Sequence, residues 1–430
     1  MALSARGAAA ATPGDGTLMW KILSDLWEPQ TNPSGFVSLG VAENSLMHEK
    51  LSEHVHKNLD LSHHDFTYGD GATGSKRLRK AIAGFVNDNF HPLRDVASAH
   101  VTVTNGCSSA LEHISWAIAN PGDGFLLGRP FYGTFLPDLS LRTGAKVIPV
   151  SFGDADPLSY DAVEIYEQAF IAARRDGQRI AGLVLCNPHN PLGRCYSPGV
   201  LFQLMRLCEK YDAHFVSDEI YALSVWENSV DVDGSSPTKM PFDSCLAINT
   251  GDVIDRSRIH AVWGMSKDFG ANGLRLGAIV SQYNPELHAA LVPVALYSSV
   301  SSISDHVSAN ILEDAAWVKD YIDENRRKLG ERYEVVTSWA RENGIAYAPG
   351  VNAAFFLWVD LGKAYRSRNA NAQIDSLDDV VMSALLKHKV FLASGKQFGS
   401  ERPGWFRIVF AHDFNYLQRG LQRVLQALAR

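Results

Sequence analysis

Residues 259–280 of the chain read IHAVWGMSKDFGANGLRLGAIV. Two apolar runs, Ile259–Trp263 and Leu276–Val280, enclose a polar turn that carries Lys267 and Arg275. Short apolar runs bounded by glycine-containing turns are typical of buried β-strands. The segment therefore predicts two buried strands joined by a turn with two basic side chains.

Five more short apolar runs precede this segment, and helical patterns separate several of them. The runs are Val101–Thr104, Gly124–Leu127, Lys146–Val150, Ile180–Leu185 and His214–Ser217, and the helical patterns are Ser109–Ile118, Ser159–Arg174 and Pro198–Tyr211. Strands that alternate with helices predict a largely parallel sheet covered by helices on both faces. We therefore expect an α/β fold with a mostly parallel, seven-stranded sheet.

The two ends of the chain differ from this alternating region. Residues 1–17 are small and flexible in composition, and we expect a disordered lead-in there. After about residue 300 a long helical reach, Ser304–Ala340, precedes a strand at Ala353–Asp360 and a polar break at 366–376. We predict a large domain over 61–300 and a smaller α+β domain over 301–430 that recruits residues 18–60.

Composition excludes several classes of protein. The charge sum is 40 − 47 = −7 without a Lys/Arg tract, so neither nucleic acid nor an anionic membrane is an expected partner. The five cysteines are scattered and form no CxxC pair, which favours reduced thiols and predicts no metal centre. No apolar run is long enough to span a membrane. We therefore expect a cytoplasmic protein that binds small molecules.

A glycine motif at 69–74, GDGATG, fits the spacing of dinucleotide-binding loops and precedes a helical pattern at Ser75–Phe90. The residues before it, Ser62–Thr67 (SHHDFT), are too polar for the buried first strand that such a site requires. The glycines therefore predict a turn and a helix entry rather than a nucleotide site.

The stronger signal is a set of polar residues that follow predicted strands, where open α/β sheets place ligands. Asn190 follows the run that ends at Leu185, Asp218 and Tyr221 follow the next run, and Lys267 and Arg275 lie in the turn quoted above. Together they supply a lysine for a Schiff base, a carboxylate for a pyridine nitrogen, donors for a ring oxygen and a cation for a phosphate. Pyridoxal 5'-phosphate requires this set of groups.

With these residues in place, the sequence resembles the fold-type I enzymes that depend on pyridoxal phosphate. It is similar to the class I/II aminotransferase superfamily and, within it, to the 1-aminocyclopropane-1-carboxylate (ACC) synthase branch. The motifs that carry the resemblance are LGVAENSL (39–46), TNGCSSALE (104–112), RPFYGTF (129–135), NPHNPLG (187–193), SDEIY (217–221), MSKDFGANGLRLG (265–277) and PGWFRIVFA (403–411). They follow one another in order over nearly the whole chain.

The resemblance implies a role for each residue that contacts the cofactor ring. Lys267 would form the covalent bond and later remove the substrate α-proton. Asp218 would pair with the pyridine nitrogen, and Asn190 and Tyr221 would donate to the ring oxygen. Tyr132 would stack on the ring.

The cofactor phosphate is expected at the start of the helix that follows Gly106, because helix N-termini bind anions. Cys107 and Ser108 open that helix, and Arg275 would add a bidentate cation. The family usually has a serine three residues before the lysine, whereas this chain has Gly264. One hydroxyl donor to the phosphate is therefore expected to be missing.

The substrate contacts are also implied by the resemblance. Arg407 would take the α-carboxylate through a planar two-point contact. Glu43 would face the substrate, and Tyr68 would reach the active site of the neighbouring subunit of a homodimer. Tyr68 is followed by glycine where plant-type ACC synthases have histidine, so strict ACC synthesis is in question.

Three functions remain open from the sequence. The leading hypothesis, based on the AEN segment at 42–44, is a carbon–sulfur lyase, with either α,γ-elimination of S-adenosylmethionine to ACC or β-elimination of a cysteine S-conjugate. Fungal relatives that cleave cysteine conjugates belong to secondary metabolism, which is the expected setting. The runner-up is an aminotransferase, and the third is an inactive scaffold with the same fold.

Overall fold

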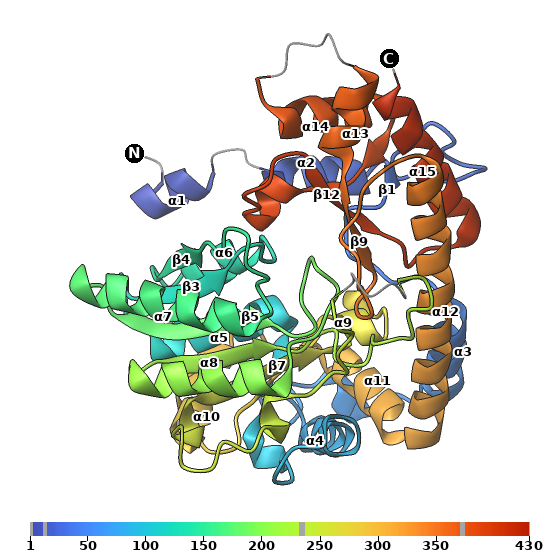
Figure 1. Ribbon diagram of the computed structural model, residues 1–430. Helices are drawn as coiled ribbons and strands as arrows, with labels where there is room; N and C mark the ends of the chain where they lie inside the picture. Colours follow the sequence, from blue (N-terminus) through green and yellow to red (C-terminus); the bar gives the residue numbers. More distant parts are fainter. Residues whose placement is uncertain (1–2, 12–14, 232–236, 370–374, 430) are drawn as a thin grey trace.

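A mostly parallel sheet of seven strands forms the centre of the larger lobe (Figure 1). The structure, a computed structural model, describes residues 3–11, 15–231, 237–369 and 375–429. The strand order is β2-β8-β7-β6-β5-β3-β4, and only β8 runs antiparallel to its neighbours. The strands are β2 (Val101–Asn105), β3 (Gly124–Gly128), β4 (Lys146–Val150), β5 (Ile180–Cys186), β6 (His214–Asp218), β7 (Ile259–Gly264) and β8 (Leu276–Val280). The predicted α/β fold and its seven strands are confirmed.

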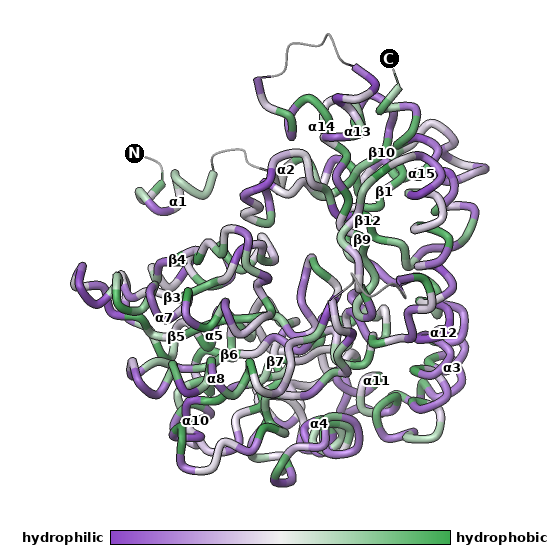
Figure 2. The backbone as a smooth tube through the Cα atoms, viewed as in Figure 1, coloured by the Kyte–Doolittle hydropathy of each residue, from purple (hydrophilic) through white to green (hydrophobic). Residues whose placement is uncertain are grey.

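Helices cover both faces of this sheet, which explains why its central strands are apolar along their whole length. Every residue of β5 (IAGLVLC) is buried. Figure 2 shows hydrophobic residues gathered on these strands, with hydrophilic residues along the outer helices. The helices of this lobe are α4 (Lys76–Phe90), α5 (Cys107–Ile118), α6 (Phe135–Ser140), α7 (Tyr160–Arg175), α8 (Pro198–Lys210), α9 (Met265–Asp268) and α10 (Pro285–Ala295). All five cysteines are free and buried.

The direction of β8 decides which residues meet at one edge of the sheet. The parallel strands β5, β6 and β7 end at Cys186, Asp218 and Gly264, at their carboxyl ends. Since β8 runs the other way and pairs with β7, its first residue, Leu276, lies at that same edge. Residues 187–190, 218–221, 265–267 and 275 are therefore brought to one edge by strand direction alone.

The second lobe combines both ends of the chain. Its three-stranded sheet has the order β11-β12-β9, and β1 near the N-terminus pairs in parallel with β10 near the C-terminus. These strands are β1 (Val37–Ser38), β9 (Phe356–Asp360), β10 (Val390–Phe391), β11 (Ala393–Ser394) and β12 (Trp405–Val409). The helices are α2 (Asp15–Leu23), α3 (His48–Asn58), α12 (Ala315–Glu342), α13 (Leu361–Arg368), α14 (Leu377–Lys387) and α15 (Phe414–Leu428). Helix α11 (Ser302–Glu313) precedes α12 and packs against α4 of the larger lobe (Figure 1). The exact domain boundaries remain a prediction.

Two segments differ from the sequence-based expectations. The long helical reach predicted over Ser304–Ala340 is helical except at Asp314, which separates α11 from α12; the Asp314 side chain accepts a hydrogen bond from Trp317 N–H and caps α12. In the predicted disordered lead-in, the alanine-rich residues Ala5–Ala10 form helix α1, which Ser4 caps. Residues 370–374 of the predicted polar break lie outside the described residues. No helix in the described ranges is both long and apolar enough to cross a membrane.

A buried carboxylate ties the loop after β6 to the second lobe. Burial alone would raise the pKa of Asp231, but hydrogen bonds, led by the one from the Tyr333 hydroxyl at 2.5 Å, lower it below its usual value. Its other donors are Asn228 Nδ2 at 2.9 Å, Tyr347 OH at 3.1 Å, Gly350 N at 3.2 Å and Arg341 Nη2 at 3.2 Å. This network fastens the loop to α12 and to the segment before β9.

Replacing Asp231 with alanine is expected to lower the free energy of unfolding by about 3–5 kcal/mol, because it leaves several buried donors without an acceptor. Urea unfolding followed by tryptophan fluorescence measures this loss. Asp154→Ala is the matched control, since that side chain is fully exposed. An equal loss in both variants would contradict the anchoring role of Asp231.

Candidate functional site

Lys267 lies in α9, directly after β7, with its amino group inside the molecule. Its Nζ donates a hydrogen bond to Ala42 O at 2.5 Å. Burial, followed by the positive charge of Arg407, lowers the pKa of Lys267 to about 8, and the carboxylate of Glu43 opposes this shift. An amine with a pKa near neutrality exists in part as the free base, which is the form that takes a proton or attacks a carbonyl.

Asp218 is the last residue of β6 and is 4% exposed. Among the described residues its carboxylate accepts a single hydrogen bond, from Ile220 N–H at 3.3 Å. Burial raises its pKa to about 7, and the nearby carboxyl groups of Asp138 and Glu219 add to the shift. A buried carboxylate with an open oxygen is stabilised by a cation, and a protonated ring nitrogen supplies one.

Arg407, in β12, crosses from the second lobe to the sheet edge. It is 3% exposed, and it donates from Nη1 to Asn190 Oδ1 at 2.8 Å and from Nη2 to Gly40 O at 2.7 Å. Its guanidinium lies over the rings of Phe356 and Phe398, at 4.7 and 4.8 Å from their centroids. Its Nε is buried and has no hydrogen-bond partner in the described part of the chain. A buried guanidinium without a carboxylate partner fits an anionic ligand.

The start of α5 forms a cradle for an anion. Gly106 precedes the helix with a φ of 80°, and a Cβ there would lie 2.4 Å from Arg275 Nη2, so only glycine lets the guanidinium come this close. Cys107 and Ser108 follow as the first helical residues, whose N–H groups have no acceptor within the helix. The donors and the cation therefore fit a phosphate group.

Gly264 lies on the floor of this cradle and leaves no room for a side chain. A Cβ at Gly264 would come within 2.5 Å of Leu276 O and 3.0 Å of Cys107 Sγ. The family usually has a serine at this position. In this chain the surrounding atoms leave no room for a serine side chain, so its hydroxyl cannot contribute to the phosphate site. Cys107 fills the neighbouring volume, and burial raises the pKa of its thiol well above its usual value.

The pKa values of Tyr221 and Tyr132 are affected by the same charged side chains. Tyr221 is buried and packs edge-on against Phe355 and Phe356, and Arg407 opposes the rise that burial causes in its pKa. Burial raises the pKa of Tyr132 as well, with Arg407 opposing and Asp218 adding to the shift. The phenols of both tyrosines are therefore close enough to Arg407 and Asp218 for those charges to shift their pKa values.

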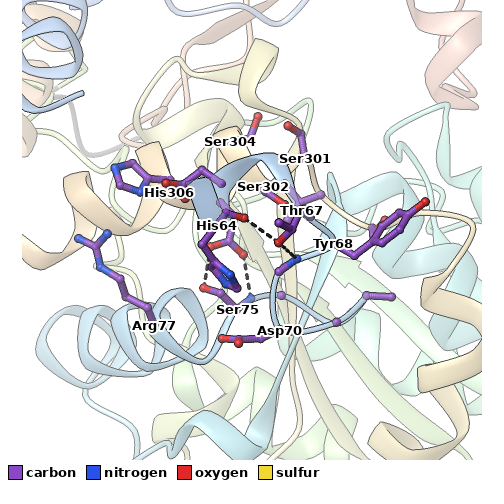
Figure 3. A pocket seen from close by; sticks show the side chains of 18 of the residues that line it. His64, Thr67, Tyr68, Asp70, Ser75, Arg77, Ser301, Ser302, Ser304 and His306 are labelled. Carbon is purple, nitrogen blue, oxygen red and sulfur yellow. Dashed lines mark hydrogen bonds and ion pairs between the residues drawn. The ribbon is translucent and has the colours of Figure 1, made fainter. Parts of the chain in front are cut away.

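Glu43 and Tyr68 occupy different surroundings. Glu43 accepts a hydrogen bond from Asn272 Nδ2 at 2.8 Å and is close enough to shift the pKa of Lys267. Tyr68 is 99% exposed and points outward from its loop (Figure 3). That loop lines a cavity of about 980 Å³ with Arg275, Leu296 and Ser302. Tyr68 itself lines this cavity together with Arg275, and its ring is open to solvent.

The structure thus gathers Lys267, Asp218, Asn190, Arg407 and Arg275 at one edge of the sheet. A proton-accepting amine, an open buried carboxylate, an anion cradle and an unpaired guanidinium are the groups that pyridoxal phosphate and an amino-acid carboxylate need. The residues present therefore fit this cofactor.

Sequence reasoning missed four contributors to the site. The carbonyls of Gly40 and Ala42 accept hydrogen bonds from the two central cations, and Asn272 holds Glu43. Asp138 accepts a hydrogen bond from Ser108 Oγ at 3.1 Å. Backbone carbonyls leave no signal in a sequence, and Asp138 lies three residues beyond the end of the motif RPFYGTF (129–135) that contains Tyr132.

Comparisons with known proteins show which family and fold the chain is similar to. The family model described as aminotransferase class I and II matches residues 34–424. The chain is 31% identical to the probable aminotransferase sirI of Leptosphaeria maculans, over 95% of each chain. It is 30% identical to 1-aminocyclopropane-1-carboxylate synthase-like protein 1 of Bos taurus, over 94% of this chain and 78% of the relative. The structure of aspartate aminotransferase from Thermus thermophilus with maleate matches with a TM-score of 0.78 at 21% identity, covering 99% of this chain and 100% of that one.

Proposed function

The chain belongs to the class I and II aminotransferase family, whose cofactor is pyridoxal 5'-phosphate, and we propose that it is a carbon–sulfur lyase of the ACC synthase-like branch. Its substrate would be an α-amino acid that carries sulfur at the β- or γ-carbon. The two forms of the reaction are α,γ-elimination of S-adenosylmethionine to ACC and β-elimination of a cysteine S-conjugate. The setting we propose is secondary metabolism.

One observation carries this proposal: the AEN segment, residues 42–44, lies directly on the site. Ala42 O accepts the hydrogen bond of Lys267 Nζ at 2.5 Å, and Asn272 fixes the carboxylate of Glu43 at 2.8 Å. A side chain of the substrate that extends beyond its α-carbon would meet Glu43. The segment that distinguishes the branch is thus also the one next to the reactive lysine.

In this proposal Lys267 and Asp218 divide the proton chemistry. When bound, the cofactor supplies an electron sink for the pair of electrons left on the substrate α-carbon. Lys267 Nζ takes the α-proton, for which its pKa of about 8 is suited. Asp218, whose carboxylate has an open oxygen, would accept a hydrogen bond from the protonated ring nitrogen, and Tyr132 would pack against the ring.

The remaining residues bind and orient. Arg407 takes the α-carboxylate in place of its present hydrogen bond to Gly40 O, while Asn190 keeps its guanidinium in plane. Tyr221 donates to the ring oxygen. Arg275, Ser108 and the first N–H groups of α5 hold the phosphate, with Cys107 as the floor.

Product analysis with two substrates tests the proposal. Purified protein is supplied separately with S-adenosylmethionine and with an S-alkyl cysteine conjugate, and the release of methylthioadenosine or of a thiol is measured. Release from one of them is the expected result, and the Lys267→Ala variant should release neither. If the wild-type protein releases no sulfur fragment from either substrate, the lyase proposal fails.

An aminotransferase is the second candidate, favoured by the name of the sirI relative and by the cofactor residues that both activities share. Simple amino acids would then convert the bound cofactor to its amine form, and 2-oxo acids would reverse this. Absorbance spectra distinguish the two forms. An inactive scaffold, the third candidate, would show neither spectral change nor product.

We also propose that a second copy of the chain covers the surface around Tyr68. Phe66, Tyr68, Leu296 and Tyr297 are 69%, 99%, 71% and 79% exposed. Tyr68 and Leu296 line the same cavity as Arg275, and Phe66 and Tyr297 are close to them in the sequence. Large apolar side chains so grouped mark an interface. The expected particle is a homodimer with twice the 47.2 kDa of one chain, measured by light scattering.

Mixed dimers test whether Tyr68 acts in the neighbouring site. Tyr68→Ala and Lys267→Ala are each expected to be poorly active, whereas refolding them together should restore about one quarter of the native sites, because a hybrid has one intact site. If Tyr68 served its own chain, every site of the hybrid would lack a residue and no activity would return. A monomer with full activity would also contradict the proposal.

A further inference from the structure

Asp138, in α6, lies against the hydroxyl that opens the phosphate cradle. Its Oδ2 accepts hydrogen bonds from Ser108 Oγ at 3.1 Å and from Thr134 Oγ1 at 3.5 Å. The carboxyl is half-buried, and α6 packs against α5, the helix that Ser108 opens. An acidic group thus touches a donor that the cofactor phosphate is expected to use.

The direction of this hydrogen bond determines what Ser108 offers to an anion. A serine hydroxyl has one proton to donate, and an ionised carboxylate only accepts. While Asp138 is ionised, Ser108 donates to it and turns only lone pairs toward a phosphate. Once Asp138 is protonated, its O–H donates to Ser108 Oγ, and the serine proton becomes free to bind the phosphate.

We propose that Asp138 is a positioning residue that carries a proton when the cofactor phosphate is bound, so that phosphate binding takes up one proton and turns Ser108 into a donor. The inference rests on the phosphate position proposed above, at the start of α5. The proton comes from solvent and stays on a carboxyl oxygen of Asp138: one O–H bond of a hydronium ion is exchanged for the O–H bond of the carboxyl, and no bond between heavy atoms changes.

The charges around Asp138 favour this protonation. Burial raises the pKa of Asp138 to about 6, against the lowering effect of its hydrogen bonds with Ser108 and Thr134. A phosphate dianion placed beside it would raise the pKa further.

Other elements packed against α6 place few opposing charges near this carboxyl. The titratable groups that feel its charge are Cys107 of α5, Tyr132 of the loop before α6 and Asp218 at the end of β6. Charged groups on the neighbouring elements have other partners. Lys146, the first residue of β4, donates a hydrogen bond to Gln178. Glu112 of α5 pairs with His113 and Arg142. The positive charges of Lys267 and Arg275 act on Cys107, and no cation contributes to the pKa shift of Asp138 among the described residues.

The test compares two ligands that differ only in the phosphate: pyridoxamine 5'-phosphate and pyridoxamine, neither of which forms a covalent bond with Lys267. Their dissociation constants for the full-length, cofactor-free protein are measured by fluorescence between pH 6 and 8. The ratio of the two constants isolates the preference for phosphate. This measurement needs no turnover.

Asp138→Asn is the informative variant, because asparagine keeps the shape of the side chain and cannot ionise. Relative to this variant, the wild-type preference for phosphate is expected to fall by up to about tenfold per pH unit above pH 6, since each unit removes the required proton from more of the molecules. Asp161→Asn, an exposed carboxyl in α7, should behave as the wild type. Equal pH dependence in wild type and Asp138→Asn would overturn the proposal.

A second pair of variants tests whether Asp138 acts through Ser108. In a Ser108→Ala background, Asp138→Asn should change the pH dependence less, because the hydroxyl that Asp138 orients is absent and only the direct charge effect is left. If the change persists in full, Asp138 acts on the phosphate by charge alone, and the positioning role is wrong. A wild-type protein without preference for the phosphorylated ligand would instead overturn the position of the phosphate, which leaves the lyase proposal to its own product assay.

Discussion

Lys267→Ala is expected to lower kcat by at least roughly 10²–10⁴-fold, which is the usual contribution of a positioned base. The physical reason is the absence of any other amine at that place. Lys267 Nζ is held at 2.5 Å from Ala42 O, and burial brings its pKa to about 8, so that about one molecule in ten presents the free base at pH 7. Steady-state kinetics with the substrate identified by product analysis measure the loss.

Lys328→Ala is the matched control for this variant. Lys328 also donates to a carbonyl of the N-terminal segment, Leu46 O at 3.1 Å, but it lies away from the sheet edge and pairs with Glu324. Its replacement should leave kcat within a factor of a few. Small primary amines added to Lys267→Ala should restore part of the activity, because they enter the space that the side chain leaves. Unchanged turnover in Lys267→Ala would refute the assignment.

Arg407→Lys is expected to raise the activation free energy that corresponds to kcat/KM by about 2–5 kcal/mol. This is the loss measured when one partner of a buried charge pair is truncated. This corresponds to roughly 30- to 5000-fold. Lysine keeps the charge but has no planar fork, so it cannot contact both oxygens of a carboxylate while also donating to Asn190. The two phenyl rings that flank the guanidinium further restrict a substitute.

The substrate itself provides the sharpest control for Arg407. An amine that lacks the α-carboxylate should react at the same slow rate with wild type and Arg407→Lys, because the contact at issue is absent from both. Arg423→Lys replaces another buried arginine, one that donates to Gly35 O at 2.6 Å and Lys389 O at 2.7 Å, and should leave kcat/KM unaffected. If all substrates lose rate equally, Arg407 serves folding rather than recognition.

Much of the central sheet could be predicted closely because its inner strands, such as β5 and β8, are fully buried and apolar. Lys146–Val150 and Leu276–Val280 were predicted with the ends that the structure has. Strand ends then place the polar residues that follow them, which is why Asp218, Lys267 and Arg275 could be grouped in advance. What the pattern lacked was the direction of β8, on which the position of Arg275 depends.

The remainder of the site depends on contacts between distant segments. Asp138 and Ser108 are 30 residues apart, and only the packing of α6 on α5 brings them together. The carbonyls of Gly40 and Ala42 act through the backbone, whose chemistry is the same at every position. Asp314 interrupts a helical pattern that is apolar on one face along its whole length, so periodicity alone could not reveal the cap.

The antiparallel pairing of β7 with β8 has a consequence for how this chain can diverge. Lys267 and Arg275 are carried by one short link between two strands that share a ladder from Ala261–Val280 to Gly264–Gly277. An insertion or deletion in that link would change the distance between the amine of Lys267 and the guanidinium of Arg275. The strands could not shift to compensate, because the hydrogen bonds between β7 and β8 fix their register. The substrate side is built otherwise, from residues 40–44 and β12, which no such link joins to the lysine. Length changes among relatives should therefore be absent between residues 264 and 276, and new specificities should arise by altering the segments that face the other half of the ligand.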